Sequence, residues 1–162
     1  MSKTAIPLPE FDTEMASTRK LLTRVPAEQG TWKPHPKSFA LGHLAQLVAR
    51  MPGWIALTLR ETELDIARGA PYSFETTDVL LREFDRNAAA AREALADVTD
   101  DALDVPWTLR LGERVIFTTP RGEVVRNHLN HLIHHRGQLT VYVRLVDAPV
   151  PAIYGPSADE RM

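Results

Sequence analysis

One long stretch near the C-terminus constrains the fold more than any other part of this chain. Apolar and histidine side chains recur there at three- and four-residue steps, the spacing of one face of an α-helix. The members of this stripe are Val124, His128, His131, Leu132, His135, Leu139, Tyr142, Val143 and Val146. Thr119 can cap its start, with Pro120 in the first turn, and Asp147-Ala148-Pro149 ends it after about seven turns at 3.6 residues each. The rest of the chain is expected to pack around this helix.

Three more amphipathic helices are expected before it. The apolar spacing indicates one helix over residues 11–25 and a second over residues 38–59, with Ser38 as its N-cap. Pro52 lies inside the second pattern and is expected to kink or break that helix. A third helix is expected over residues 76–98, where a threonine pair and an aspartate start the pattern. Together the four helices predict an all-α fold, a four-helix bundle.

The connections between these helices differ in character. Two prolines stiffen residues 28–37 into an ordered, non-helical crossing. Residues 61–75 show no sustained period and are expected to be mainly connection. The alternating pattern around Gly112 predicts a short hairpin before the last helix, with an extended excursion as the alternative. The proline-rich tail is expected to be non-helical and to dock on the bundle through Ile153 and Tyr154.

The composition narrows the class of protein. Hydrophobic residues make up 44% of the 162 and charged residues 25%, the balance of a globular protein with one core, so a single domain over residues 1–162 is expected. The formal net charge is −2 and arginines are mixed with acids, so nucleic acid is not an expected partner. No run reaches the ~18 apolar residues of a membrane span, so a cytoplasmic protein without membrane contact is expected. The absence of cysteine excludes disulfides and thiolate metal sites.

Two histidines on the long helix form a candidate metal site. His131 and His135 are four residues apart, which puts them on one helix face with Cβ atoms roughly 6 Å apart, a spacing that suits two neutral imidazoles on one cation. The expected cofactor is one divalent metal ion per chain, zinc or nickel, with iron or manganese as alternatives. His43, at the edge of the second helix's apolar stripe, is the natural third ligand, although a core-edge histidine is the plainer interpretation. On spacing alone His128 is a rival, since it shares an arc of about 60° with the pair.

The residues around this pair have open roles. His134 lies about 100° around the helix from His135, toward the flank, and is expected to support a ligand or to lie on the surface. Arg136 and Gln138 are candidates for orienting ligands or binding an anion, although an exposed arginine on a helix is more often only solvated. Gly137 is expected to permit close packing against a neighbouring helix, at a helical cost of about 1 kcal/mol.

Three stretches of the chain carry a family resemblance. They are Ser38-Phe-Ala-Leu-Gly-His43-Leu-Ala, Asn130-His131-Leu-Ile-His134-His135-Arg136-Gly137-Gln138-Leu139 and Ile153-Tyr-Gly-Pro-Ser-Ala-Asp-Glu160. Together they resemble the DinB/YfiT family of metalloenzyme-like proteins over almost the whole chain. The resemblance implies a four-helix bundle in up-down-down-up order, commonly dimeric, with a divalent metal on three histidines. It maps those ligands onto His43, His131 and His135 and thereby decides against His128.

The resemblance also directs the functional expectation. Three neutral ligands leave a coordination position open, which is typical of a catalytic metal that activates water or deprotonates a substrate thiol. Leu132 stands where the helix of a zinc protease carries glutamate, which excludes that class. Related proteins include thiol-dependent S-transferases, so metal-dependent transfer of a low-molecular-weight thiol is expected, with a metal-dependent hydrolase as the first alternative. A non-catalytic, stress-linked binding or dimerisation module is the second. The expected partners are a small-molecule substrate and a second copy of the chain.

Overall fold

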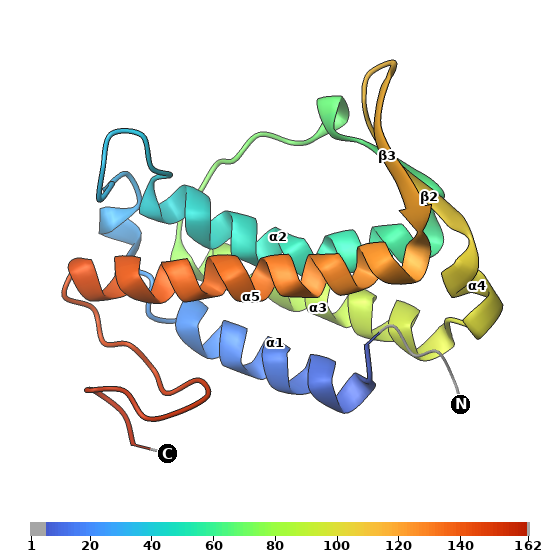
Figure 1. Cartoon of the computed structure of the whole chain (residues 1–162). Coiled ribbons are helices and arrows are strands. Elements are labelled where there is room, and N and C mark those ends of the chain that lie inside the picture. The colour runs from blue at the N-terminus through green and yellow to red at the C-terminus, as the bar shows by residue number, and fades with distance from the viewer. Residues whose placement is uncertain (1–5, 162) are drawn as a thin grey trace.

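Residues 6–161 are described by the computed structural model, which shows four long helices side by side and a small sheet at one end (Figure 1). The long helices are α1 (Leu8–Leu22), α2 (Leu41–Arg60), α3 (Thr77–Asp97) and α5 (Arg121–Leu145). In Figure 1, α1 and α5 run in one direction and α2 and α3 in the other, so the expected bundle and its up-down-down-up order are confirmed. Because α2 and α3 are parallel, the connection between them must return along the whole bundle.

The long helices enclose one apolar core. α2 packs most extensively against α3 and α5, and α1 lies mainly against α3. The core side chains with no exposed surface come from every long helix and include Leu21, Leu22, Leu41, Val48, Ile55, Ala91, Leu129, Leu132, Leu139 and Val143. Burying Leu- and Val-sized side chains stabilises the fold by roughly 1.5–3 kcal/mol each. The helix periods in the sequence therefore indicate the buried faces correctly.

Neither of the two expected helix caps is formed. The third helix does begin at the expected threonine pair, and the hydroxyl of Thr76 caps it by accepting a hydrogen bond from the N–H of Val79 at 3.2 Å. Ser38 does not cap α2, which begins only at Leu41 because the proline-stiffened loop extends up to that residue. Thr119 does not cap α5 either. It belongs to the last strand, and its hydroxyl donates instead to a carboxylate in the first turn of α5.

Pro52 lies in the middle of α2 without interrupting it. The helix is continuous from Leu41 to Arg60, so of the expected kink or break, the break is wrong. Proline removes the N–H that would bond to the carbonyl of Val48. The side-chain amide of Asn87 on α3 donates to the next carbonyl, that of Ala49, at 3.0 Å. This bond from the neighbouring helix supports the turn that the proline weakens.

A three-stranded sheet closes one end of the bundle. β2 (Pro106–Leu111) and β3 (Arg114–Pro120) form the expected antiparallel hairpin, whose turn includes Gly112 at a φ of 58°. β1 (Glu63–Asp65) pairs with β2 in parallel and was not expected, because three residues are too few to show a period. The short helix α4 (Asp100–Asp104) also lies outside the expected elements. Two 3₁₀ turns, Ala27–Gln29 and Ile66–Arg68, complete the secondary structure.

The C-terminal tail folds back over α1 and α5, as expected (Figure 1). The carboxylate of Asp159 accepts from the N–H of Val150 and pairs with Arg144, and the carboxylate of Glu160 accepts from the N–H of Ala152 and pairs with Lys20. These bonds tie the tail to itself and to both helices. Within residues 6–161, no helix is long and apolar enough to cross a membrane.

Candidate metal centre

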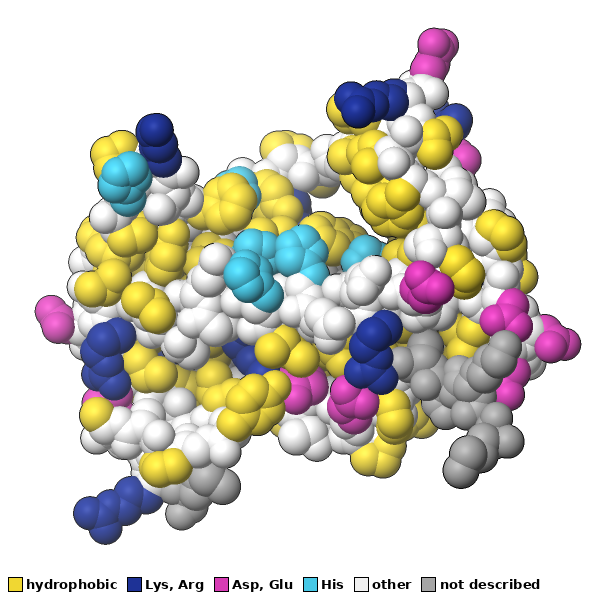
Figure 2. Space-filling view, viewed as in Figure 1, with side chains coloured by type: hydrophobic (Ala, Val, Ile, Leu, Met, Phe, Trp, Pro, Cys, Tyr) yellow, Lys and Arg dark blue, Asp and Glu magenta, His cyan; other side chains and the backbone are white. Residues whose placement is uncertain are grey.

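His131 and His135 meet on the surface of α5. Their Nε2 atoms lie 2.9 Å apart and their ring centroids 4.6 Å apart. Two imidazole nitrogens bound to one zinc ion at about 2.0–2.1 Å each are separated by roughly 3 Å, so this separation is that of a pair able to share one ion. The expected pairing of these two histidines is therefore present. Figure 2 shows the histidines gathered along α5 with apolar side chains around them.

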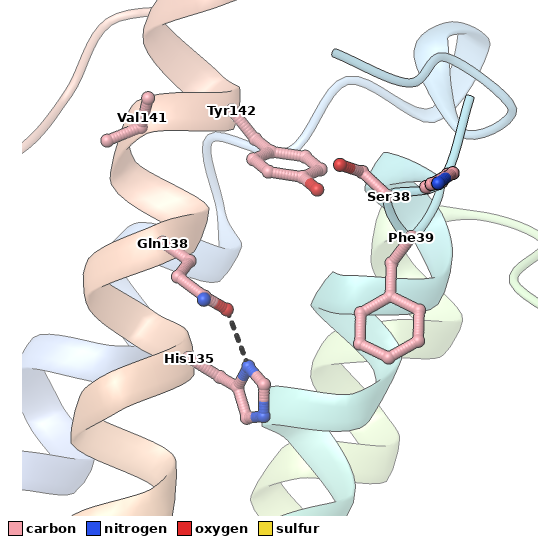
Figure 3. A pocket seen from close by; sticks show the side chains of 7 residues that line it. Ser38, Phe39, His135, Gln138, Val141 and Tyr142 are labelled. Atoms are coloured by element: carbon pink, nitrogen blue, oxygen red, sulfur yellow. Dashed lines mark hydrogen bonds between the residues drawn. The ribbon is translucent and has the colours of Figure 1, made fainter. Parts of the chain in front are cut away.

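Gln138 orients the ring of His135. The side-chain oxygen of Gln138 lies 2.7 Å from Nδ1 of His135, one turn away on the same helix (Figure 3). An amide oxygen only accepts, so Nδ1 carries the hydrogen and Nε2 of the neutral ring presents its lone pair toward His131. Supports of this kind fix the tautomer of metal-binding histidines. Of the two roles open to Gln138, the structure shows the orienting one.

The surroundings of His131 favour a neutral ring. Partial burial, followed by the neighbouring His135 and His134, lowers the pKa of His131 below its ordinary value. The ring of Trp54, from α2, lies 6.2 Å from that of His131. A neutral imidazole is the form that coordinates a metal, so this environment retains the binding form at neutral pH.

His43 lies on α2 in an aromatic stack. Its ring is stacked on Tyr72 at 4.0 Å between centroids and on Phe39 at 4.5 Å. Burial lowers the pKa of His43, with Arg50 and Lys33 adding to the effect. Within residues 6–161, no group of three or more His, Cys, Asp or Glu side chains is arranged to hold a metal ion, so His43 does not complete the pair in this conformation.

Phe39 connects His43 to the pair. Its ring stacks on His43 and also lies 6.4 Å from the ring of His135. Phe39 and Tyr72 are absent from the residues singled out in the sequence. Phe39 stands four residues before His43, an interval that signals proximity, whereas nothing in the long connection marks Tyr72 as a partner of a residue on α2.

The remaining histidines of α5 have other surroundings. Nε2 of His128 lies 3.1 Å from the hydroxyl of buried Thr58, and its ring contacts Trp54 and Trp107 at centroid distances of 5.8 and 6.3 Å. Burial is the main cause that lowers the pKa of His128 to about 4. His128 is thus a packed, neutral side chain engaged elsewhere. His134 is exposed, with its ring 4.9 Å from that of His135.

Arg136 is the clearest departure from the sequence-based expectation. It was expected to orient a ligand, to bind an anion or only to be solvated, but it is 2% exposed and forms an ion pair with Glu14 at 2.6 Å. It also donates to the hydroxyls of Thr18 and Tyr154, at 3.2 and 2.8 Å. The tail supplies Tyr154, whose own hydroxyl donates to Glu14. Gly137, expected in a tight helix contact, is exposed and has open space beside it.

A cavity of about 440 Å³ lies beside His135, between the loop that precedes α2 and the second half of α5. Its lining residues are Lys37, Ser38, Phe39, His135, Gln138, Val141 and Tyr142 (Figure 3). This volume lies within the range of small-molecule sites. A separate cavity of about 490 Å³ is lined by His43 and Tyr72 among others. The histidine pair is therefore next to a space that can hold a small molecule.

Comparison with known proteins gives the same family as the three quoted stretches. The sequence model of the DinB family matches residues 1–161. The chain belongs to the DinB family. YrdA of Bacillus subtilis (strain 168), an uncharacterized protein, is 28% identical over 160 residues, which cover 94% of this chain and 89% of YrdA.

Solved structures agree with the fold of this DinB-family protein. A DinB-like protein from Bacillus cereus ATCC 10987 superposes with a TM-score of 0.69 and 25% identity, covering 91% of this chain and 95% of that one. The DinB-like protein YjoA from Bacillus subtilis gives a TM-score of 0.68, with coverage of 96% and 98%. At 18% identity, the likeness to YjoA supports the fold alone.

Proposed function

We propose that this DinB-family protein is a metal-dependent enzyme that transfers a low-molecular-weight thiol. The observation that carries the proposal is the 2.9 Å separation of the Nε2 atoms of His131 and His135, with Gln138 fixing one of the rings. His131 and His135 are the first two ligands of one divalent ion, zinc or nickel, with iron or manganese as alternatives. His43 is the third ligand.

His43 must leave its aromatic stack to take this role. Its ring would have to give up its contacts with Phe39 and Tyr72 and reach the pair. Separating two stacked pairs costs about 0.5–1.5 kcal/mol each, which is small beside the free energy that a bound divalent ion supplies. The stack is therefore compatible with a resting position from which His43 joins the pair.

The lining of the cavity favours thiol chemistry over hydrolysis. A divalent ion, when bound, lowers the pKa of a thiol that coordinates it. None of the residues that line the cavity beside His135 is an Asp or Glu, so the site offers no carboxylate base for activating water. A thiol needs less help, because its ordinary pKa is about 8.5. In the transfer, sulfur bonds to an electrophilic carbon, the leaving group departs with the bonding electrons, and the thiol proton passes to solvent.

A thiol assay tests this function directly. The zinc-loaded protein is mixed with cysteine, glutathione or coenzyme A and with 1-chloro-2,4-dinitrobenzene, and thioether formation is followed by absorbance. We expect a rate above that of the uncatalysed reaction for at least one thiol, and its loss in His135→Ala. A zinc-loaded parent that gives no rate above background with any of several thiols and electrophiles would contradict transferase activity and leave the binding module as the better account.

The proposal includes a homodimer. Val141 and Leu145, one turn apart on α5, are 56% and 55% exposed, although both are apolar. An apolar strip on one helix is suited to a two-fold contact in which it meets its own copy. Sedimentation at micromolar concentration should give a dimer, and Leu145→Glu should shift the protein to a monomer. A monomeric parent would contradict this part of the proposal.

A further inference from the structure

The cavity beside His135 is lined by several side chains that can donate hydrogen bonds. Lys37 brings an ammonium group, Ser38 and Tyr142 bring hydroxyls, and Gln138 brings an amide whose oxygen already accepts from His135. Within residues 6–161, no side-chain hydrogen bond or ion pair engages the ammonium group of Lys37 or either hydroxyl. No carboxylate lines the cavity. Lys37 is thus the one charged residue of the lining, and no lining carboxylate offsets it.

These donors come from both walls of the cavity. In Figure 3 the hydroxyls of Ser38 and Tyr142 face each other across it. Each is held by its own surroundings. The N–H of Ser38 donates to the carbonyl of His35 at 2.9 Å, and the ring of Tyr142 packs edge-on against Trp32 at a centroid distance of 5.8 Å. The two residues are therefore held on opposite walls, so a group that enters between them can meet both hydroxyls.

We propose that this cavity binds a small organic carboxylate. Lys37, Ser38 and Tyr142 hold the carboxylate at one end of the cavity, and the reacting group of the same molecule lies at His135. The identity of the reacting group rests on the proposed function. Under that function, the substrate is a low-molecular-weight thiol that carries a carboxylate.

The other walls define the body of the ligand. Phe39, 44% exposed, presents apolar surface inside the cavity. An apolar body between the charged end and the reacting end would cover this side chain and remove it from water. One ammonium group suits a monoanion, whereas a phosphate at neutral pH carries up to two charges. The lining therefore favours a carboxylate with an aliphatic or aromatic body.

A binding experiment with a matched pair of probes tests this assignment. 3-Phenylpropanoate and its neutral amide, 3-phenylpropanamide, have the same body and differ in the charge of the end group. We expect the full-length, metal-free protein, kept in a chelator, to bind the carboxylate about tenfold more tightly than the amide in a chemical-shift titration. Phenyl phosphate binding as tightly as the carboxylate would overturn the choice of a monoanion.

Substitutions show which residues cause the preference for the carboxylate over the amide. Lys37→Met should weaken carboxylate binding by roughly fivefold and leave the amide nearly unchanged, because an exposed charge pair contributes modestly. Tyr142→Phe should weaken carboxylate binding by a few-fold through one lost hydrogen bond. Lys33→Met is the matched control, since this lysine belongs to the same loop but lines the other cavity. Equal effects of Lys37→Met and Lys33→Met would overturn the proposal.

The use of metal-free protein separates this inference from the proposed function. If no metal binds in a parallel zinc titration while the carboxylate preference depends on Lys37, the metal enzyme fails and the carboxylate site stands. If zinc binds but the metal-free protein does not distinguish the carboxylate from the amide, the carboxylate site fails alone. Carboxylate binding that appears only after zinc is added would likewise overturn it, because the ion would then be the receptor in place of Lys37.

Discussion

His135 and Arg136 are neighbours on α5, yet they belong to two opposite kinds of polar site. Arg136 faces α1 and is 2% exposed, and its donors are used by Glu14, Thr18 and Tyr154. His135 faces the cavity, where Nε2 has only another imidazole as its partner. The first site is saturated by groups of the protein. In the second, two imidazole nitrogens are directed at each other, and no carboxylate lines the cavity beside them.

The difference shows what separates a structural polar cluster from a functional one in this bundle. A helix turns 100° per residue, so adjacent residues can face a buried seam and an open surface. Buried polar groups persist when every donor and acceptor is matched. The two imidazole nitrogens satisfy each other only when one ring donates its hydrogen to the other, and a bound ion would take the place of that hydrogen. We therefore expect substitutions around Arg136 to change stability and substitutions around His135 to change metal affinity.

The largest expected effect is at the buried cluster around Arg136. Arg136→Met leaves the carboxylate of Glu14 buried without its partner, which should lower the free energy of unfolding by roughly 3–5 kcal/mol. Urea denaturation measures it. Arg92→Met is the matched control, because its ion pair with Asp12 is about half exposed and should contribute little to the free energy of unfolding. Equal losses in the two variants would show that the buried cluster contributes no more to stability than the exposed ion pair.

The next effect is a pH dependence that arises from His128. The folded protein keeps this ring neutral down to a pKa of about 4, whereas the unfolded chain protonates it near its ordinary value of 6.5. Between these values the unfolded state binds more protons, so stability is retained above pH 6.5 and falls by about 3 kcal/mol as pH drops toward 4. His128→Gln should remove this loss in urea denaturation of metal-free protein. His134→Gln, on the exposed face, should leave it unchanged, and an unchanged loss in His128→Gln would assign it to another group.

A smaller effect is expected at the pair of His131 and His135. Gln138→Leu removes the acceptor of the Nδ1 hydrogen of His135, which should lower metal affinity by roughly 10–100-fold with little change in stability. Gln138→Glu is the control, because a carboxylate keeps the acceptor. Competition with a chromophoric chelator measures both. The orienting role would be wrong if Gln138→Leu bound zinc as tightly as the parent.

The smallest effect concerns the hydrogen bonds between the C-terminal tail and the cluster around Arg136. Tyr154→Phe removes a hydroxyl that donates to Glu14 and accepts from Arg136, which should lower the free energy of unfolding by about 1 kcal/mol, since the residue is 66% exposed. Tyr142→Phe should leave stability unchanged, because that hydroxyl has no hydrogen-bond partner within residues 6–161. Calorimetry measures the thermal stability of both variants. Equal stabilities would show that the Tyr154 hydroxyl does not stabilise the cluster around Arg136.

The sequence predicts the elements of this fold better than the contacts between them. Apolar periods locate α1, α2, α3 and α5, and the hairpin follows from alternation around Gly112. β1 is too short to show a period, and it exists because β2 offers it a neighbouring strand. α2 begins at Leu41 and α5 at Arg121 because the preceding loop and strand extend up to those residues. Local preferences for capping residues do not predict how far such a loop or strand extends.

The candidate site shows the same limit. A spacing of four residues predicts the meeting of His131 and His135, because the helix itself sets that distance. The burial of Arg136 depends on Glu14, 122 positions earlier in the chain, and on a tail that folds back. The stack of His43 on Tyr72 depends likewise on the path of a long connection. Such partners come from tertiary packing and leave no trace in local spacing.

The central claim is that the converging nitrogens of His131 and His135 hold a divalent ion, and a zinc titration tests it most directly. Binding is measured by calorimetry on the parent and on single alanine variants, with elemental analysis after dialysis against a weak chelator. We predict one ion per chain in the parent, strong loss of binding in His131→Ala, His135→Ala and His43→Ala, and near-parent binding in His128→Ala. Loss of the ion in His128→Ala, together with its retention in His131→Ala or His135→Ala, would contradict the account.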